Sequence, residues 1–418
     1  MENELIFGCI ADDFTGASDM ASFLVKGGMK TILLSGIPEG CDTQGYDAAV
    51  IALKSRTQET SQAVADSLKA LHWLRDMGCA HLYIKYCSTF DSTKSGNIGP
   101  IVDAALEEFG IPYTILCPAL PVNGRTVYGG KLYVNGTPLD ESPMKNHPLT
   151  PMWDCRIREL MRPQGKYPCM MMDTAMLHES DEKIKERINA FADNNRHFYI
   201  VPDYIKSDDA ARLVSLFGRL PLLTGASGLA EELGRMFRGG AGEYPGSKNA
   251  GSKTLILAGS CSKATLEQID TFLSSGGKGI KLFPDALADK RQSAEDVVSM
   301  AEDLGDTVLI YSSDTPENVR KNQCGGKEQV SALLEETTAR IACLSLARNF
   351  RNIIVAGGET SGAVTQALGF SSFTVGASAA PGVPVLIPTA RQDIRLVLKS
   401  GNFGGKTFFE DTAKLIGT

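Results

Sequence analysis

The chain has 418 residues, with 42 Lys and Arg against 49 Asp and Glu, so its net charge is −7. This acidic balance argues against binding to nucleic acid or to an anionic membrane, because both select basic surfaces. The length exceeds that of one core of ordinary size and predicts two domains. We find no apolar run of the roughly 18 residues that span a bilayer and no basic start typical of a signal peptide, so we expect a cytoplasmic protein.

The first 117 residues alternate short apolar runs with amphipathic stretches. The stretch over 60–77 is typical of a helix, because Ala63, Leu71 and Leu74 belong to a set of apolar residues at helical spacing. Repeated β-α units of this kind predict a mostly parallel sheet covered by helices. We predict strands over 4–11, 30–35, 48–53, 81–86 and 113–117, and helices over 16–26, 60–77 and 98–109.

The pattern is interrupted after the fifth strand. Residues 126–136 predict a hairpin with Gly129 and Gly130 at its turn. Residues 137–168 are rich in Pro, and an irregular segment of that length usually covers a site or has a function of its own. The β-α pattern then resumes, with strands predicted over 169–173 and 198–202 and helices over 182–192, 207–217 and 229–237.

Residues 238–253 contain five glycines and one proline and show no apolar period, which is typical of a linker. A second β-α series follows it. We therefore predict an α/β protein of two domains, each a mostly parallel sheet flanked by helices, with an N-terminal domain over 1–240, a linker over 241–253 and a C-terminal domain over 254–418. The strands of the second domain are expected over 254–259 and near 279–283, 307–312, 352–356, 383–387 and 395–399.

The ten cysteines and five histidines lack the spacing of a metal site. No C-x-x-C pair occurs, and some cysteines lie inside apolar runs, as Cys117 does. We expect free thiols in a reducing compartment and no zinc centre.

Ligands of parallel α/β sheets bind outside the carboxyl ends of the strands. The first strand is followed there by Asp12 and Asp13, with Thr15, Ser18 and Asp19 close behind. Such an acidic pair can bind Mg²⁺, accept a hydroxyl proton or hydrogen-bond a polyol. Helix capping is the alternative, but a cap needs one such residue and this loop supplies five. We favour a functional role for the pair.

Cations and hydroxyls follow other strands of the same sheet, where they suit a carboxylate or phosphate ligand. Solvated surface charge is the ordinary alternative for Lys and Arg. Several such loops at one sheet edge favour a binding site. Its candidate residues are Arg56, Lys85, Ser88, Asp91, Ser92, Asn123 and Arg125.

The second domain offers glycine loops instead. Glycine allows close backbone approach, and free N–H groups at a helix N-terminus attract phosphate oxygens. An ordinary tight turn with a Ser or Thr cap is the alternative for each loop, but three such loops favour phosphate binding. The candidate residues are Ser260, Ser262, Gly357, Gly358, Glu359, Thr360, Ser361, Gly362, Gly401, Gly404 and Gly405.

Residues 400–407 nearly match the P-loop pattern G-x-x-x-x-G-K-[ST]. Ser400 stands where its first glycine is required, and we predict no clear helix after Lys406, so we reject a Walker A site. The two earlier loops do not complete G-x-G-x-x-G either, so a dinucleotide fold is not supported.

Residues 11–19 (ADDFTGASD) resemble the opening signature of the four-carbon acid sugar kinase family. That family has an N-terminal sugar-acid-binding domain and a C-terminal nucleotide-binding domain. The segment over 117–152 most resembles the 3-oxo-tetronate kinases within it. Further matches run through both domains, at residues 86–93, 117–128, 146–152, 258–262 and 357–362.

The resemblance implies ATP-dependent phosphorylation of the C4 hydroxyl of a four-carbon sugar acid, with ATP and Mg²⁺ as cofactors and the active site in the cleft between the domains. It favours 3-oxo-tetronate, with D-threonate and D-erythronate as alternatives. An NAD-dependent sugar-acid dehydrogenase, a non-catalytic sugar-acid sensor and a homodimer stay open. On this hypothesis Arg56 and Lys85 hold the carboxylate, Asp12, Ser88, Asp91 and Ser92 hold hydroxyls, and Asp12 or Asp13 is the catalytic base.

Overall fold

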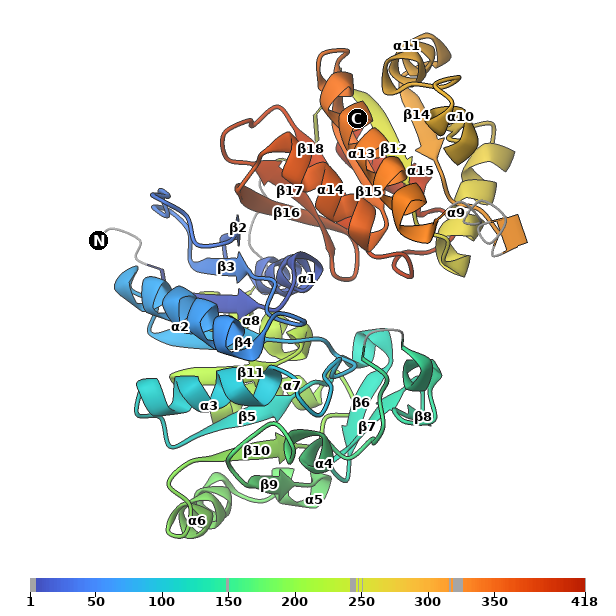
Figure 1. Ribbon diagram of the computed structural model, residues 1–418. Helices are drawn as coiled ribbons and strands as arrows, with labels where there is room; N and C mark the ends of the chain where they lie inside the picture. Colours follow the sequence, from blue (N-terminus) through green and yellow to red (C-terminus); the bar gives the residue numbers. More distant parts are fainter. Residues whose placement is uncertain are drawn as a thin grey trace. The chain divides into compact units, whose positions relative to one another are not determined.

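The computed structural model describes residues 5–147, 150–240, 246, 248, 249, 251–315, 317, 318 and 326–417. The chain divides into two compact units, Met1–Glu243 and Tyr244–Thr418, and both contain helices and strands (Figure 1). Cys324 and much of the linker predicted over 241–253 lie outside the described residues. The nine cysteines within them are free thiols. No helix of the described part is long and apolar enough to cross a membrane.

The N-terminal unit has a parallel sheet, as the alternating pattern predicts. Its central strands are buried along their whole length, as strands covered on both faces must be. The strand order, in the described part, is β2 (Thr31–Ser35), β3 (Ala48–Ala52), β1 (Phe7–Ala11), β4 (His81–Lys85), β11 (Leu222–Gly225), β5 (Tyr113–Cys117), β10 (Phe198–Pro202) and β9 (Cys169–Met172).

Helices cover both faces of this sheet (Figure 1). The helices α2 and α3 pack against each other on one face, whereas α1, α7 and α8 pack together on the other. The bounds are α1 (Phe14–Lys26), α2 (Thr60–Asp76), α3 (Ile98–Glu108), α5 (Thr174–Leu177), α6 (Asp181–Ala192), α7 (Asp209–Phe217) and α8 (Ala230–Arg238), with a short 3-10 turn η3 (Ser227–Leu229) before α8. Strand β11 was not predicted, because its four residues offer too short an apolar run.

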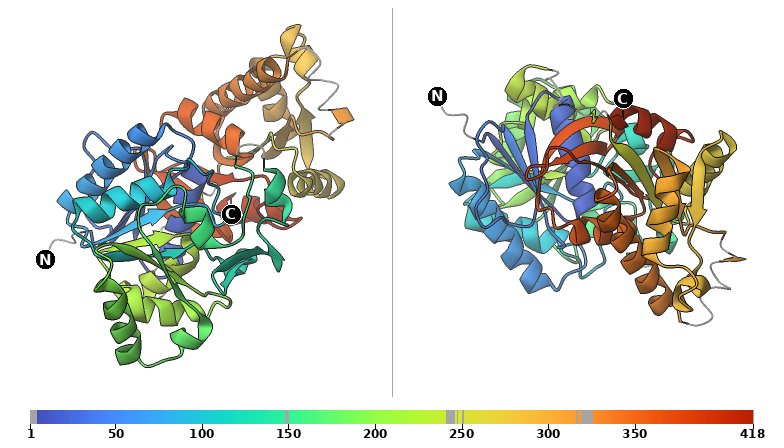
Figure 2. Two further views of the ribbon diagram at one scale, coloured as in Figure 1. Left: turned by 60° about the horizontal axis from the view of Figure 1, so that its bottom comes forward. Right: turned by 90° about the horizontal axis from the view of Figure 1, so that it is seen from above.

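The predicted hairpin is confirmed as β6 (Arg125–Tyr128) and β7 (Lys131–Val134). Gly129 and Gly130 have φ values of 56° and 70°, as a tight hairpin turn requires. With β8 (Thr137–Pro138) they form a small separate sheet beside the main one (Figures 1 and 2). The irregular segment predicted over 137–168 also contains η2 (Pro143–Asn146) and α4 (Ile157–Met161), and η1 (Pro121–Asn123) precedes β6.

The sheet of the C-terminal unit is mostly parallel, as predicted, but one strand runs against its neighbours. Strand β17 pairs antiparallel with both β16 and β18, and the sequence predicted neither this direction nor β16. The order is β13 (Lys278–Lys281), β14 (Thr307–Tyr311), β12 (Lys253–Ala258), β15 (Phe350–Ala356), β18 (Arg395–Lys399), β17 (Val383–Pro388) and β16 (Ser372–Ala380).

The prediction that no helix follows Lys406 is wrong, because α15 begins at Phe408 and buries Phe408, Phe409 and Ile416 in the core. A strand, a loop and a helix are therefore present. The rejection of a Walker A site now depends on Ser400, which replaces the required glycine. The helices are α9 (Lys263–Ser274), α10 (Pro284–Ala288), α11 (Ala294–Leu304), α13 (Lys327–Leu346), α14 (Gly358–Leu368) and α15 (Phe408–Gly417).

Candidate active site

The acidic pair and two cations follow three neighbouring strands of the N-terminal sheet. Asp12 and Asp13 follow β1, Arg56 follows β3, and Lys85 ends β4, and these strands lie in the order β3, β1, β4. The chain leaves β1 towards β2 on one side and leaves β3 towards β4 on the other. This reversal creates a crevice at the carboxyl edge of a parallel sheet, where ligands bind.

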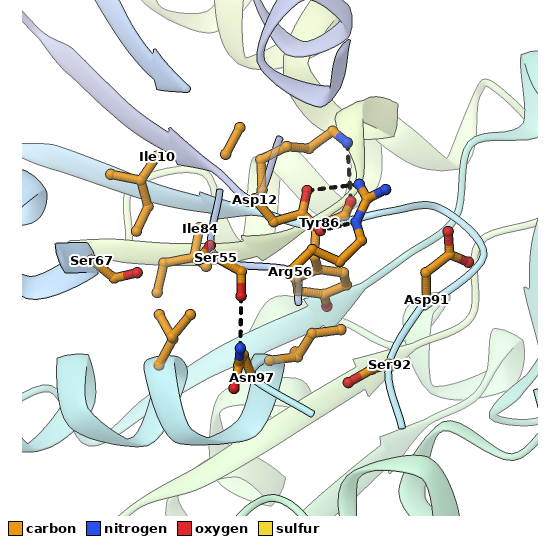
Figure 3. A pocket seen from close by; sticks show the side chains of 14 residues that line it. Ile10, Asp12, Ser55, Arg56, Ser67, Ile84, Tyr86, Asp91, Ser92 and Asn97 are labelled. Atoms are coloured by element: carbon orange, nitrogen blue, oxygen red, sulfur yellow. Dashed lines mark hydrogen bonds and ion pairs between the residues drawn. The ribbon is translucent and has the colours of Figure 1, made fainter. Parts of the chain in front are cut away.

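Arg56 joins both acids of the pair. Its Nε and Nη2 donate to the two carboxylate oxygens of Asp12 at 2.7 and 3.0 Å, a bidentate contact that fixes the geometry (Figure 3). Nη2 also lies 2.9 Å from Asp13 Oδ2. Burial lowers the pKa of Arg56, but the charges of Asp12 and Asp13 outweigh it, so the net direction is upward and the guanidinium stays protonated.

Helix capping and a functional role are the alternatives that the sequence leaves for the acidic pair, and Asp13 is suited to both. Its Oδ1 accepts from Gly16 N at 2.5 Å and caps α1, so the capping alternative is part of the structure. Burial and the neighbouring charge of Asp12 raise the pKa of Asp13 above its ordinary value. A carboxylate with a raised pKa is a better proton acceptor, which suits a general base.

Lys85 is almost completely buried, with 3% of its surface exposed, and has an acidic neighbour in α1. Its Nζ donates to Tyr86 O at 3.0 Å and lies 3.8 Å from Asp19 Oδ2, which also accepts from Ser227 Oγ at 2.5 Å. Burial lowers the pKa of Lys85, but Asp19 and Asp12 outweigh it, so the net direction is upward. The ammonium group is therefore charged.

Asp19 and Ser227 were not predicted as site residues. Asp19 lies within the acidic motif but at a helical position, and Ser227 is 208 residues away, so the sequence gives no sign of their contact. Buried polar atoms near them lack a partner among the described residues, namely Asp19 Oδ1, Ser18 Oγ and Arg125 Nε. Such unsatisfied groups are costly, and a catalytic role or a bound water or ion can account for them.

Gly16 lies where the acidic pair and Lys85 converge. A Cβ atom there would lie 2.8 Å from Asp13 Oδ1, 3.4 Å from Lys85 Nζ and 3.5 Å from Asp12 Oδ1. Only the distance to Asp13 is too short for a real Cβ, so a side chain here would push Asp13 from its capping position, and the glycine of the sequence motif keeps Asp13 in place.

A small pocket, with a cavity volume of about 20 Å³, lies beside these groups. Of the predicted residues, Asp12, Arg56, Lys85, Asp91 and Ser92 line it, whereas Ser88, Asn123 and Arg125 do not. Asp13 is not in the lining, but it forms an ion pair with Arg56, which is. Its remaining polar lining, which the sequence did not predict, comprises Ser55, Ser67, Tyr86 and Asn97 (Figure 3).

The loop after β4 is held in one shape. Phe90, fully buried, has a φ of 53°, which a bulky residue rarely adopts, and strain of this kind is common at functional sites. Thr89 Oγ1 donates to Asp91 Oδ1 at 2.6 Å, and Ser92 Oγ donates to Gln164 Oε1 at 3.1 Å. Asn97 Nδ2 binds the carbonyl of Ser55 at 2.7 Å, which ties the β3 loop to α3.

The C-terminal unit has a larger pocket, of about 500 Å³, at the carboxyl ends of β12 and β15. Ligand pockets of several hundred cubic ångströms accommodate molecules of cofactor size. The helix α14 starts in its wall, and Gly357 provides no side-chain cap, so backbone N–H groups stay available for phosphate. Of the predicted residues, Ser260, Gly357, Gly358, Glu359 and Thr360 line it.

The other predicted nucleotide residues lie outside this pocket's lining. Ser262 caps α9 and donates to Gly401 O at 2.7 Å, so the first and third glycine loops touch. A Cβ at Gly401 would lie 2.2 Å from Ser260 Oγ. The predicted residues not in the lining are Ser262, Ser361, Gly362, Gly401, Gly404 and Gly405, and unpredicted lining residues include Ser312, Asp314 and Ser331.

Comparisons with known proteins define the class of protein first. Family models described as "Sugar-binding N-terminal domain" and "Nucleotide-binding C-terminal domain" match residues 7–233 and 255–409. The chain thus combines a sugar-binding and a nucleotide-binding domain.

Full-length relatives then define the family. The chain is 41% identical to a 3-oxo-tetronate kinase of Cupriavidus necator, with 99% of this chain and 97% of the relative covered. It is 42% identical to one of Pseudomonas fluorescens, with 97% and 95% covered. A crystal structure of a Haemophilus influenzae protein superposes with a TM-score of 0.85 at 38% identity, over 97% and 99% of the two chains. The protein belongs to the four-carbon acid sugar kinase family, and the resemblance predicted from its motifs is confirmed.

Proposed function

We propose that this protein transfers the γ-phosphoryl group of ATP to the C4 hydroxyl of 3-oxo-tetronate, forming 3-oxo-tetronate 4-phosphate. The convergence of Asp12, Asp13, Arg56 and Lys85 at one pocket of the sugar-binding domain is the observation that carries the proposal. The names of the full-length relatives support the choice of substrate.

The roles that we propose for the two cations differ from the first expectation. Arg56 already uses Nε and Nη2 on the acidic pair, so it orients Asp12 and Asp13 and is not the main carboxylate ligand. Lys85, held by a carbonyl and by the charge of Asp19, has donors left for the sugar acid. Asp91 and Ser92 in the pocket wall bind hydroxyls.

Asp13 is the proposed base for the C4 hydroxyl. Both acids contact Arg56, and the raised pKa of Asp13 is what favours it as the proton acceptor. Phosphoryl transfer otherwise depends on in-line positioning and charge neutralisation, so the two domains must bring their ligands together during turnover.

Mg²⁺ is expected with ATP, since it usually binds phosphates together with one or two carboxylates. Glu359 and Asp314 line the nucleotide pocket. Asp314 Oδ2 lies 2.7 Å from Lys281 Nζ, so the carboxylate of Asp314 is already in an ion pair. Glu359 is exposed at the start of α14, so it fits the role of a magnesium ligand. A bound ion would neutralise phosphate charge during transfer.

ADP release across a panel of four-carbon acids tests the function. We expect kcat/KM for 3-oxo-tetronate to exceed that for D-threonate or D-erythronate by at least about tenfold, because a ketone only accepts hydrogen bonds whereas a hydroxyl also donates. The assay is run with and without Mg²⁺, and release is expected only with it.

Each other outcome of these assays indicates a different substrate or a different function. Faster turnover of a reduced acid would overturn the substrate assignment and keep the kinase. Acid binding without ADP release would indicate a sensor, and reduction of NAD⁺ would indicate a dehydrogenase.

Gly358→Val tests the nucleotide pocket. A Cβ at Gly358 meets no protein atom within 4 Å, so the variant should fold, while its side chain enters the space that we assign to phosphate. We expect calorimetry to show a loss of ATP affinity of at least about tenfold with unchanged binding of the sugar acid. Gly246→Val is the matched control, because Gly246 also has open space but lies outside the pocket lining. Unchanged ATP affinity in Gly358→Val would refute the assignment.

A further inference from the structure

The glycine loop after β18 turns its carbonyl oxygens into the C-terminal unit. The carbonyl of Gly401 accepts from Lys399 Nζ at 3.0 Å, from Ser262 Oγ at 2.7 Å and from Thr265 Oγ1 at 2.9 Å. Lys399 Nζ also donates to Ser400 O at 3.3 Å. The start of the loop is therefore fixed by a buried cation and two hydroxyls.

The rest of the loop is held by one amide. Gln268, fully buried on α9, directs Nε2 at the carbonyls of Phe403, Gly404 and Gly405, at 3.1, 3.2 and 2.9 Å. Its Oε1 has no partner among the described residues. An amide that leaves its own acceptor unsatisfied to hold three carbonyls has a positioning role, since the unpaired oxygen costs about 1–3 kcal/mol.

With its carbonyls held inward, the loop has N–H groups left over. Those of Gly401, Asn402, Gly404 and Gly405 donate to no atom of the described residues. Successive free N–H groups form a concavity that binds anions, of the kind that holds phosphate in nucleotide sites. Ser262, which donates its Oγ to Gly401 O, also donates its backbone N–H to Ser260 Oγ at 3.2 Å, and Ser260 lines the nucleotide pocket, so the loop lies next to that pocket.

The buried position of Lys399 is expected to destabilise the fold. Lys399 is 1% exposed, and no carboxylate of the described part of the chain offsets its burial. Its neighbours are uncharged, namely Thr265 on α9 at 3.1 Å, the ring of Phe408 on α15 at 5.7 Å and the loop carbonyls. Burial accordingly lowers the pKa of Lys399 to about 8. A buried, unpaired ammonium group would be disfavoured unless it served the loop.

We propose that Lys399 and Gln268 are positioning residues for the nucleotide, which hold the carbonyls of residues 400–405 inward so that the N–H groups of this loop bind the phosphates of ATP. The proposal rests on the proposed kinase function. Neither residue touches the nucleotide, and both act through the backbone between them.

Lys399→Met tests the proposal, because Met keeps the length and apolar stem of the side chain but cannot bind a carbonyl. We expect the affinity for a non-hydrolysable ATP analogue, measured by calorimetry, to fall at least about tenfold. The melting temperature should be unchanged or higher, since a buried unpaired charge is removed. Affinity for 3-oxo-tetronate should stay the same. A residue with only a structural role would lose stability together with both affinities.

Lys253→Met is the matched control. Lys253 also donates to a carbonyl, that of Glu302 at 3.2 Å, and lies over a ring, that of Phe350 at 5.4 Å, but at the amino end of β12. It should keep full affinity for the analogue. Gln268→Met provides a second variant with the same expected loss, and it decides the question if Lys399→Met does not fold.

The outcomes separate this proposal from the kinase function. If the unsubstituted protein does not bind the analogue, the proposed function fails. If it binds and both Lys399→Met and Gln268→Met bind within about twofold of it, the positioning role is overturned. Equal losses of analogue and sugar-acid affinity would overturn it too, because they would indicate general damage to the fold.

Discussion

Replacing Asp13 by Asn is expected to lower kcat by roughly 10²-fold or more while the melting temperature stays the same. The reason is that Asn keeps the acceptor oxygen that caps α1 through Gly16 N, since Asn and Asp cap helices about equally well. The change removes only the charge and the basicity. Coupled ADP release measures kcat, and the melting temperature from thermal unfolding shows whether the helix cap is kept.

Asp173→Asn is the matched control for this variant. Asp173 caps α5 by accepting from Met176 N at 2.9 Å, and it does not line the sugar-acid pocket. Its kcat should be that of the unsubstituted protein. Near-native kcat in Asp13→Asn would leave Asp13 with the capping role alone and would transfer the base to Asp12.

The pH dependence has a sign that follows from the pKa of Asp13. A base works only when it is deprotonated, and burial with the charge of Asp12 raises this pKa. Activity should therefore be lost as the pH falls through a value above that of an ordinary Asp, and Asp13→Asn should abolish this acid limb.

The sequence predicts those parts of the fold and of the site that depend on local pattern. The β-α alternation identifies the parallel sheets, and residues at strand ends are brought to one edge whatever the details of packing. Asp12, Arg56 and Lys85 could be chosen for that reason. The hairpin at Gly129 and Gly130 has a local cause as well.

The rest depends on contacts between distant residues. Strand β11 joins the sheet between β4 and β5 because long-range pairing, not its four-residue pattern, determines its place. The position of β11 places Ser227, which follows this strand, in contact with Asp19, and no spacing in the sequence reveals that contact. The pairing of Arg56 with the acidic pair is also tertiary, and for this reason the role that we propose for Arg56 differs from the one expected from the sequence.

The buried pair of Lys85 and Asp19 gives the second large prediction. Lys85→Met should destabilise the protein by about 3–5 kcal/mol, because it leaves the carboxylate of Asp19 buried without its cation. It should also abolish most of the kcat/KM for the sugar acid, because the cation proposed for the substrate carboxylate is lost. Urea denaturation and ADP release measure the two effects separately.

A second substitution separates stability from function. Adding Asp19→Asn to Lys85→Met removes the unpaired charge, so the double variant should recover most of the lost stability and none of the lost activity. Burial raises the pKa of Asp19, so protonation of this carboxyl relieves the single variant at low pH. A raised pKa in the folded state means that stability falls as the pH rises. The free energy of unfolding of the single variant should therefore be further below that of the double variant at about pH 8 than at about pH 5. If the double variant regained activity with its stability, Lys85 would serve the fold alone, and the carboxylate of the substrate would need another cation.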